Sequence, residues 1–146
     1  MAQRIVVDAN LCIALTIPLP YSEVAAKQWL FWEMNRFEIY APVLWEYEIV
    51  SALRKAITAR LISKRDTENA LQRLLVLGVE RKTPDPDLHR AALQWAERAK
   101  QTVAYDSQYL ALAEGLQADF WTAHKRLVDS LKSRKLAWLH WIGEAT

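Results

Sequence analysis

The chain has 146 residues, the usual size of one compact domain, and carries no linker, low-complexity tract or internal repeat. We therefore expect a single domain over residues 1–146. Its net charge is only +2, from 19 basic and 17 acidic residues, which excludes a strong general attraction to nucleic acid and leaves only local binding.

Five short apolar patterns predict β-strands, and long helical patterns separate them. We expect the strands near residues 4, 37, 79, 118 and 136. Helices are expected over residues 22–36 with Ser22 as N-cap, over 43–61, from the cap Ser63 to Gly78, and over "DPDLHRAALQWAERAK", "DSQYLALAEGL" and "HKRLVDSLKS". Short strands that alternate with helical crossovers predict an α/β fold, in which helices cover both faces of a parallel sheet.

The single cysteine and the hydropathy pattern indicate in which cellular compartment the protein resides. Cys12 cannot form an internal disulfide, and its place in an apolar run favours a buried thiol under reducing conditions. No apolar run approaches the roughly 20 residues that cross a bilayer, and the first residues lack the zones of a signal peptide. We expect a cytoplasmic protein without a membrane partner.

The first strand pattern ends at a carboxylate, Asp8. Burying a charge without a partner is expensive, so this position calls for an explanation. In an open parallel sheet the functional crevice lies outside the carboxyl ends of the strands, where Asp8 falls. An aspartate after a strand is also an ordinary turn former or helix N-cap, so Asp8 alone does not decide between the two interpretations.

Two further acids occupy comparable places. Glu48 interrupts the apolar face of the 43–61 helix, to which Tyr47 is also assigned, whereas Glu46 can point outward. Asp106 opens the next-to-last helix, where its side chain could be only an N-cap. Capping does not explain why three segments each direct one acid to one side of the sheet. Like charges that converge in a partly buried site repel, and a divalent cation is the usual solution.

Carboxylates with open positions suit Mg²⁺ or Mn²⁺, hard ions that keep several waters and often share phosphate oxygens. Such a site performs metal-assisted hydrolysis of phosphodiesters. The sequence has no zinc-ligand spacing of cysteines and histidines, no GxGxxG turn, no Walker loop and no GxSxG elbow. Nucleotide-cofactor and serine-hydrolase chemistry therefore lack support.

Three motifs occur in a familiar order: "VVDAN", "YEIVSALRKA" and "AYDSQYLALAEGLQADFWTAHKRL". In these, the chain resembles the PIN-domain nucleases, and most closely the toxin subunits of VapBC toxin–antitoxin pairs. The resemblance implies a three-layer α/β/α sandwich around a short-stranded parallel sheet, RNA cleavage with Mg²⁺ or Mn²⁺, and a homodimer held inactive by a cognate antitoxin. It also implies metal-binding or ligand-positioning roles for Asp8, Glu48 and Asp106, with Asn10 and Thr122 in support.

One position departs from the family. The motif after the fourth strand usually reads "TAD" there, whereas this chain has His124 in place of the acid. The imidazole could bind the metal ion, or His124 could be an exposed histidine at a helix start. Asp119 is a poor substitute, because strand alternation points it elsewhere. The lost acid leaves a second function open: a catalytically weak or inactive PIN domain that serves as an RNA-binding or protein-interaction module.

Two surface patterns suggest binding. The basic residues Arg54, Lys55, Arg60 and "HKR" at 124–126 could contact RNA phosphates, or could simply be solvated. The 22–36 helix carries an apolar band too wide for one core-facing stripe: Trp29, Leu30, Phe31, Trp32 and Met34. Trp29 and Met34, or their neighbours, could form a groove for an antitoxin helix or a dimer surface, unless the whole band packs in the core.

Overall fold

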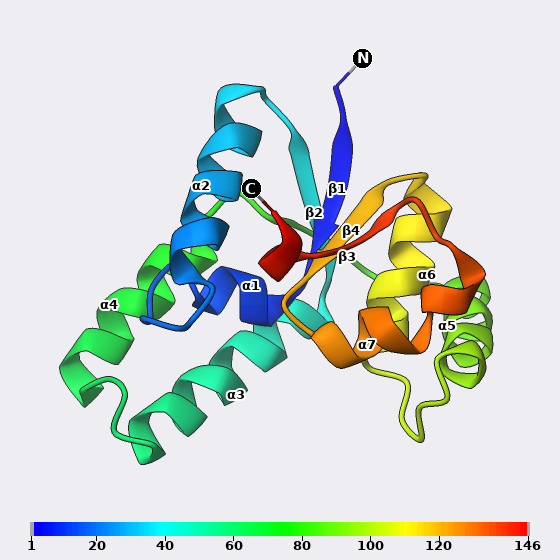
Figure 1. Ribbon diagram of the computed structural model, residues 1–146. Coiled ribbons are helices and arrows are strands. Elements are labelled where there is room, and N and C mark those ends of the chain that lie inside the picture. Colours follow the sequence, from blue (N-terminus) through cyan, green and yellow to red (C-terminus); the bar gives the residue numbers. More distant parts are fainter. Residues whose placement is uncertain (1, 146) are drawn as a thin grey trace.

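The computed structural model describes residues 2–145 and shows a parallel five-stranded sheet with helices on both sides (Figure 1). The strands are β1 (Arg4–Val7), β2 (Glu38–Pro42), β3 (Glu80–Lys82), β4 (Asp119–Thr122) and β5 (Leu139–Trp141). They lie in the order β3-β2-β1-β4-β5, and each neighbouring pair is parallel. The five predicted strands and the predicted α/β class are confirmed.

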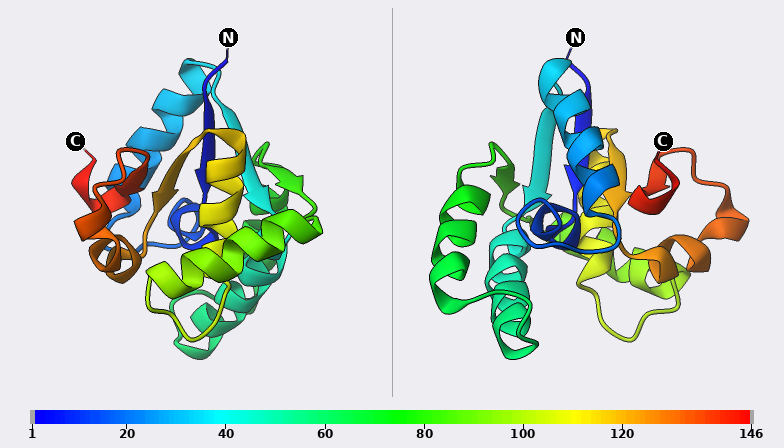
Figure 2. Two further views of the ribbon diagram at one scale, coloured as in Figure 1. Left: turned by 90° about the vertical axis from the view of Figure 1, so that its right-hand side faces the viewer. Right: turned by 60° about the vertical axis from the view of Figure 1, so that its left-hand side comes forward.

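The helices within residues 2–145 follow the predicted order, with shorter ends. They are α1 (Ala9–Ile13), α2 (Ser22–Met34), α3 (Leu44–Thr58), α4 (Lys64–Leu75), α5 (Pro86–Arg98), α6 (Asp106–Leu116) and α7 (Lys125–Ser130), with 3-10 turns η1 (Lys132–Arg134) and η2 (Ile142–Glu144). The α5–α6 pair packs together beside the sheet (Figure 2). Helix α1 was not predicted, because its five residues continue the apolar run of β1. None of the described helices is long and apolar enough to span a membrane.

Side-chain caps fix where several helices begin. Ser63 caps α4 as predicted, since its Oγ accepts a hydrogen bond of 3.1 Å from the amide of Asp66. The prediction that Ser22 caps α2 is wrong, because Ser22 is the first helical residue and Tyr21 occupies the cap position. The Ser22 hydroxyl instead accepts from the amide of Leu19 at 2.8 Å and donates to the carbonyl of Ile17 at 3.0 Å. It therefore closes the loop before the helix.

The aromatic band of α2 divides between the core and the surface. Trp29 and Trp32 are buried, and the Trp32 ring meets Trp121 of β4 edge to face at 5.6 Å. The prediction that Trp29 lines an external groove is therefore wrong. Leu30, Phe31 and Met34 are 56%, 52% and 74% exposed. These three side chains form the α2 surface patch.

Helix α3 turns a different stripe to the core from the one predicted. Its buried residues are Trp45, Ile49, Leu53 and Ala56, so the assignment of Tyr47 to the apolar face is wrong, and Tyr47 is 72% exposed. Glu48 lies beside this stripe and is half-buried. Glu46 points outward as predicted and pairs with Arg81 at 2.9 Å.

Candidate active site

The candidate site lies where the chain reverses its direction across the sheet. From β1 the chain builds β2 and β3 on one side, then crosses to β4 and β5 on the other. The carboxyl ends of β1 and β4 therefore form the switch point at which open parallel sheets hold their ligands. Asp8 follows β1 and Thr122 ends β4, and the two strands are paired next to these residues.

Asp8 is the most deeply buried acid of the site, with 8% of its surface exposed. Its Oδ1 accepts a hydrogen bond of 2.8 Å from the amide of Leu11, so it does cap α1. Its Oδ2 accepts from the hydroxyl of Thr122 and, at 3.2 Å, from the amide of Ala123. Burial raises the pKa of the Asp8 carboxyl to about 6, although these hydrogen bonds pull it down.

Thr122 and Asn10, both expected to support Asp8, differ in the structure. Thr122 is fully buried, donates to Asp8 and accepts at 2.9 Å from the amide of His124. Asn10 is exposed on α1, and within residues 2–145 Asp8 receives none of its hydrogen bonds from it. The structure therefore supports the expected contact for Thr122 and not for Asn10.

Asp106 begins α6 but does not cap it. Tyr105 occupies the cap position, so the N-cap interpretation of Asp106 is wrong. The Asp106 Oδ2 accepts at 3.0 Å from the side-chain amide of Gln101 and lies 2.8 Å from Nδ1 of His124. Burial alone would raise the pKa of Asp106, but these hydrogen bonds and the charge of His124 hold it below its usual value.

His124 occupies the cap position of α7, yet its ring is committed to Asp106. The hydrogen bond that the protonated Nδ1 donates to the Asp106 carboxylate raises the pKa of the imidazole above 6.5, whereas partial burial lowers it. The two shifts have opposite signs, as expected for a carboxylate paired with an imidazolium. His124 is therefore more than an exposed histidine at a helix start.

Glu48 reaches the site from α3 and is held by Tyr109 of α6. The Tyr109 hydroxyl donates to Oε1 of Glu48 at 2.6 Å, and the Tyr109 ring is buried and stacked on Phe120. Burial raises the pKa of Glu48, the Tyr109 hydrogen bond opposes this, and the charges of Asp8 and Asp106 raise it further. The three predicted acids thus share one electrostatic environment.

Sequence reasoning missed Tyr109 and Gln101, which orient two of the acids. A signal existed for Tyr109, because it begins the apolar run "YLALA" three residues after Asp106, and its hydroxyl requires a partner when buried. No local signal identifies Gln101, since it lies in an irregular segment between α5 and α6.

The donor chemistry of the site fits a hard divalent cation. Each carboxylate offers oxygen lone pairs beyond the hydrogen bonds described above, and oxygen is the ligand that Mg²⁺ and Mn²⁺ prefer. Across residues 2–145, however, no three His, Cys, Asp or Glu side chains are already arranged to hold a metal ion. Binding a cation would require these side chains to adjust, above all Asp106, which His124 holds.

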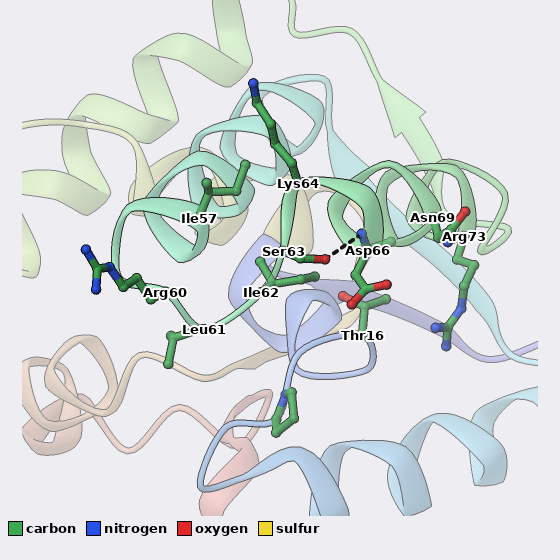
Figure 3. A pocket seen from close by; sticks show the side chains of 12 residues that line it. Thr16, Ile57, Arg60, Leu61, Ile62, Ser63, Lys64, Asp66, Asn69 and Arg73 are labelled. Atoms are coloured by element: carbon green, nitrogen blue, oxygen red, sulfur yellow. Dashed lines mark hydrogen bonds between the residues drawn. The ribbon is translucent and has the colours of Figure 1, made fainter.

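Two other features lie away from these acids. Figure 3 shows a pocket at the junction of α3 and α4, lined by Arg60, Lys64 and Arg73 but by none of the three acids. Asp119 begins β4 at the opposite end from Thr122 and lies 2.9 Å from Nε2 of His140. The prediction that Asp119 cannot replace the missing acid is confirmed.

Comparison with known proteins identifies the family. No family model matches the chain. Ribonuclease VapC12 of Mycobacterium tuberculosis, from strain CDC 1551 / Oshkosh and equally from strain H37Rv, is 31% identical over 126 residues, which cover 86% of this chain and 91% of the relative. The chain belongs to the VapC family of PIN-domain proteins.

Solved structures of low sequence identity share the fold of this VapC family member. PAE2754 from Pyrobaculum aerophilum superposes with a TM-score of 0.65 at 23% identity, over 98% of this chain and 93% of that one. FitAB bound to an IR36 DNA fragment superposes with a TM-score of 0.64 at 16% identity, over 94% of each chain. These likenesses confirm the predicted PIN-like α/β/α sandwich.

The raised pKa of Asp8 predicts how stability depends on pH without divalent cations. Because the folded value of about 6 exceeds the ordinary 3.8, the folded state binds more protons between these values. The contribution of Asp8 to the free energy of unfolding should therefore fall by about 3 kcal/mol as pH rises from about 4 to about 6 and stay level above. Asp8→Asn cannot ionise and should lack this fall.

Urea unfolding in chelator at a series of pH values measures the effect as the difference between Asp8→Asn and the unsubstituted protein. Asp119→Asn, an exposed acid at the other end of β4, is the matched control and should keep the fall. Parallel curves for Asp8→Asn and the unsubstituted protein would show that Asp8 is not a buried charge.

Proposed function

We propose that the protein is an endoribonuclease that cleaves RNA phosphodiester bonds with a bound Mg²⁺ or Mn²⁺ ion, and that it is the toxin of a toxin–antitoxin pair. The observation that carries the proposal is the meeting of Asp8, Glu48 and Asp106 in one electrostatic environment at the switch point of the sheet. The relative's name, Ribonuclease VapC12, supports the same reaction and substrate.

Asp8, Glu48 and Asp106 would hold the cation, with His124 at its edge. When bound, the cation supplies Lewis-acid chemistry, which offsets charge on the phosphate and makes water a better nucleophile. The rest of the chain keeps these oxygens in place. Thr122 orients Asp8, Tyr109 orients Glu48 and Gln101 orients Asp106, each through one hydrogen bond.

A second function has one specific observation in its favour. His124 is paired with Asp106 at 2.8 Å, so it engages a carboxylate that the metal ion would need as a ligand. A site in which this pair persists would be catalytically weak, and the protein would then serve as an RNA-binding or protein-interaction module. The exposed Arg54 and Lys55 on α3 are candidates for phosphate contacts in either case.

Metal dependence is the first prediction from the proposed function. The protein should cleave single-stranded RNA with Mg²⁺ or Mn²⁺ and stop when chelator is added. Asp8→Asn, Glu48→Gln and Asp106→Asn should each lower the rate at least tenfold, on the order of 1.4 kcal/mol of lost transition-state stabilisation or more. Cleavage is followed on gels under single-turnover conditions.

Glu46→Gln is the matched control for Glu48→Gln, because Glu46 lies on the same helix and points outward to Arg81. It should cleave at the unsubstituted rate. Full activity in Asp8→Asn, or cleavage that persists in excess chelator, would contradict the mechanism.

The raised pKa of His124 predicts how the RNA cleavage rate changes at acidic pH. Because Asp106 raises the pKa of His124 above 6.5, the imidazolium persists at higher pH than usual, holds Asp106 and repels the cation. Activity should therefore fall as pH decreases through this pKa, by about tenfold per pH unit for a single proton. His124→Asp should raise activity at low Mg²⁺ and flatten this limb, whereas His124→Ala should remain slow.

The measurement is the cleavage rate against Mg²⁺ and Mn²⁺ concentration at several pH values, with cation binding followed in parallel by calorimetry. Imidazole favours Mn²⁺ over Mg²⁺, so replacing His124 should reduce any preference for Mn²⁺. Superimposable curves for the three proteins would place His124 outside the site.

The family suggests an antitoxin partner, and the α2 surface patch is the candidate contact. Leu30, Phe31 and Met34 are exposed on one helix, and clustered exposed apolar side chains mark partner surfaces. We propose that an antitoxin encoded by an adjacent small gene covers them, and that the protein also forms a homodimer. The complex should slow hydrogen exchange in residues 24–34.

Phe31→Asp should weaken the antitoxin complex at least tenfold, about 1.4 kcal/mol, because it places a charge in an apolar contact. Val76→Asp is the control, since Val76 is 80% exposed at the end of α4. Equal exchange of residues 24–34 with and without the partner would refute this contact.

A further inference from the structure

A second pocket adjoins the candidate active site between the α5–α6 loop and α7. It has a volume of about 420 Å³, within the range of small-molecule sites, and its polar lining includes Lys100, Gln101, Asp106, His124 and Arg126. Asp106 and His124 belong to the candidate active site as well. An RNA strand bound at Asp106 and His124 would therefore lie next to this pocket.

Gln101 lines this pocket, and its side chain carries a buried acceptor without a partner. Its Nε2 donates to Oδ2 of Asp106 at 3.0 Å, while its Oε1 is buried and has no hydrogen-bond partner within the described residues. The amide cannot flip to satisfy Oε1, because the flip would place that oxygen against the Asp106 carboxylate. A buried acceptor left unpaired is costly, so Oε1 is suited to a donor brought by a ligand.

The positively charged side chains of the pocket indicate that the ligand also carries an anionic group near that donor. Lys100 and Arg126 are exposed, and within residues 2–145 neither pairs with an acid. Asp106 is the one acid in the lining, and its Oδ2 is already engaged by His124 and Gln101. The neighbouring Lys125, by contrast, lies outside the lining and pairs with Asp129 at 3.6 Å.

Local backbone geometry holds Gln101 in this position. Lys100, two residues after α5, has a left-handed backbone with φ 56°, which lets the amide of Gln101 donate to the carbonyl of Ala96 at 2.9 Å. The loop is thereby turned back towards the start of α6. Lys100 and Gln101 thus follow the end of α5, and Arg126 lies in the first turn of α7, which begins directly after His124.

We propose that this pocket is a ribonucleotide subsite, in which Lys100 and Arg126 bind a backbone phosphate and Oε1 of Gln101 accepts a hydrogen bond from a ribose 2′-hydroxyl. The 2′-hydroxyl is the donor that distinguishes RNA from DNA, so Gln101 makes the site select RNA. This inference rests on the proposed ribonuclease function and assigns its sugar selectivity to one residue.

Binding of oligouridylate rU12 and of its deoxyuridine counterpart dU12 tests the subsite, because the two probes share the same bases and differ in the 2′-hydroxyl. Binding is measured by fluorescence anisotropy in chelator, which prevents metal-dependent cleavage. The unsubstituted protein should prefer rU12. Gln101→Met should lower the ratio of the two affinities about threefold to tenfold, the effect of one lost hydrogen bond.

Arg126→Met should weaken both probes alike and reduce the salt slope of binding by about 0.7, the value for one phosphate contact on a single strand. Arg134→Met, at an exposed arginine outside the lining, is its matched control and should leave both affinities and the slope unchanged. A change in sugar selectivity is informative beyond folding, since a merely structural loss would weaken rU12 and dU12 together.

An unchanged affinity ratio in Gln101→Met, or no preference for rU12 in the unsubstituted protein, would overturn the subsite. Equal effects of Arg126→Met and Arg134→Met would overturn the phosphate contact. Metal-dependent RNA cleavage by the unsubstituted protein, assayed separately, distinguishes these outcomes from failure of the proposed function, because cleavage can stand while the assigned subsite fails.

Discussion

The buried carboxylate of Asp8 is the constraint on which the rest of the site depends. A charge at the end of the central strand must find donors, and it takes them from three neighbouring places in the fold: the first turn of α1, the end of β4 and the backbone that leads into α7. The same hydrogen bonds fix the start of α1 and the exit of β4. Even with these partners, burial keeps the pKa of Asp8 near 6, so the site retains a charge that a cation would stabilise.

Helix α6 brings the second half of the site to Asp8. Its buried face packs on the sheet, and this packing holds the Tyr109 ring in place. The Tyr109 hydroxyl can therefore donate to Glu48, which lies on α3. Asp106 begins the same helix and meets His124, which follows β4. The helix that completes the core therefore also positions two acids of the site, Asp106 directly and Glu48 through Tyr109.

The sequence was most informative where a pattern repeats locally. Period-two and helical patterns identified the five strands and most helices, and the place of each acid at an element end identified Asp8 and Asp106. It was least informative where long-range contacts decide. Trp29 is buried because it packs against Trp32, which in turn meets Trp121 of a distant strand, and Tyr109 and Gln101 matter only through partners brought close by the fold. The short helix α1 was missed because its residues continue the apolar run of β1.

Replacing an acid by His124 changes the charge balance of the site in two directions. With a fourth carboxylate, the metal-free site would gather four negative groups, and their repulsion would oppose folding. The imidazolium instead neutralises Asp106 and leaves the repulsion mainly between Asp8 and Glu48. The same pairing makes any cation compete with a proton and with His124 for Asp106. Under the proposed metal-dependent mechanism, we therefore expect His124 to make the metal-free protein more stable and its affinity for the cation lower than a carboxylate at this position would.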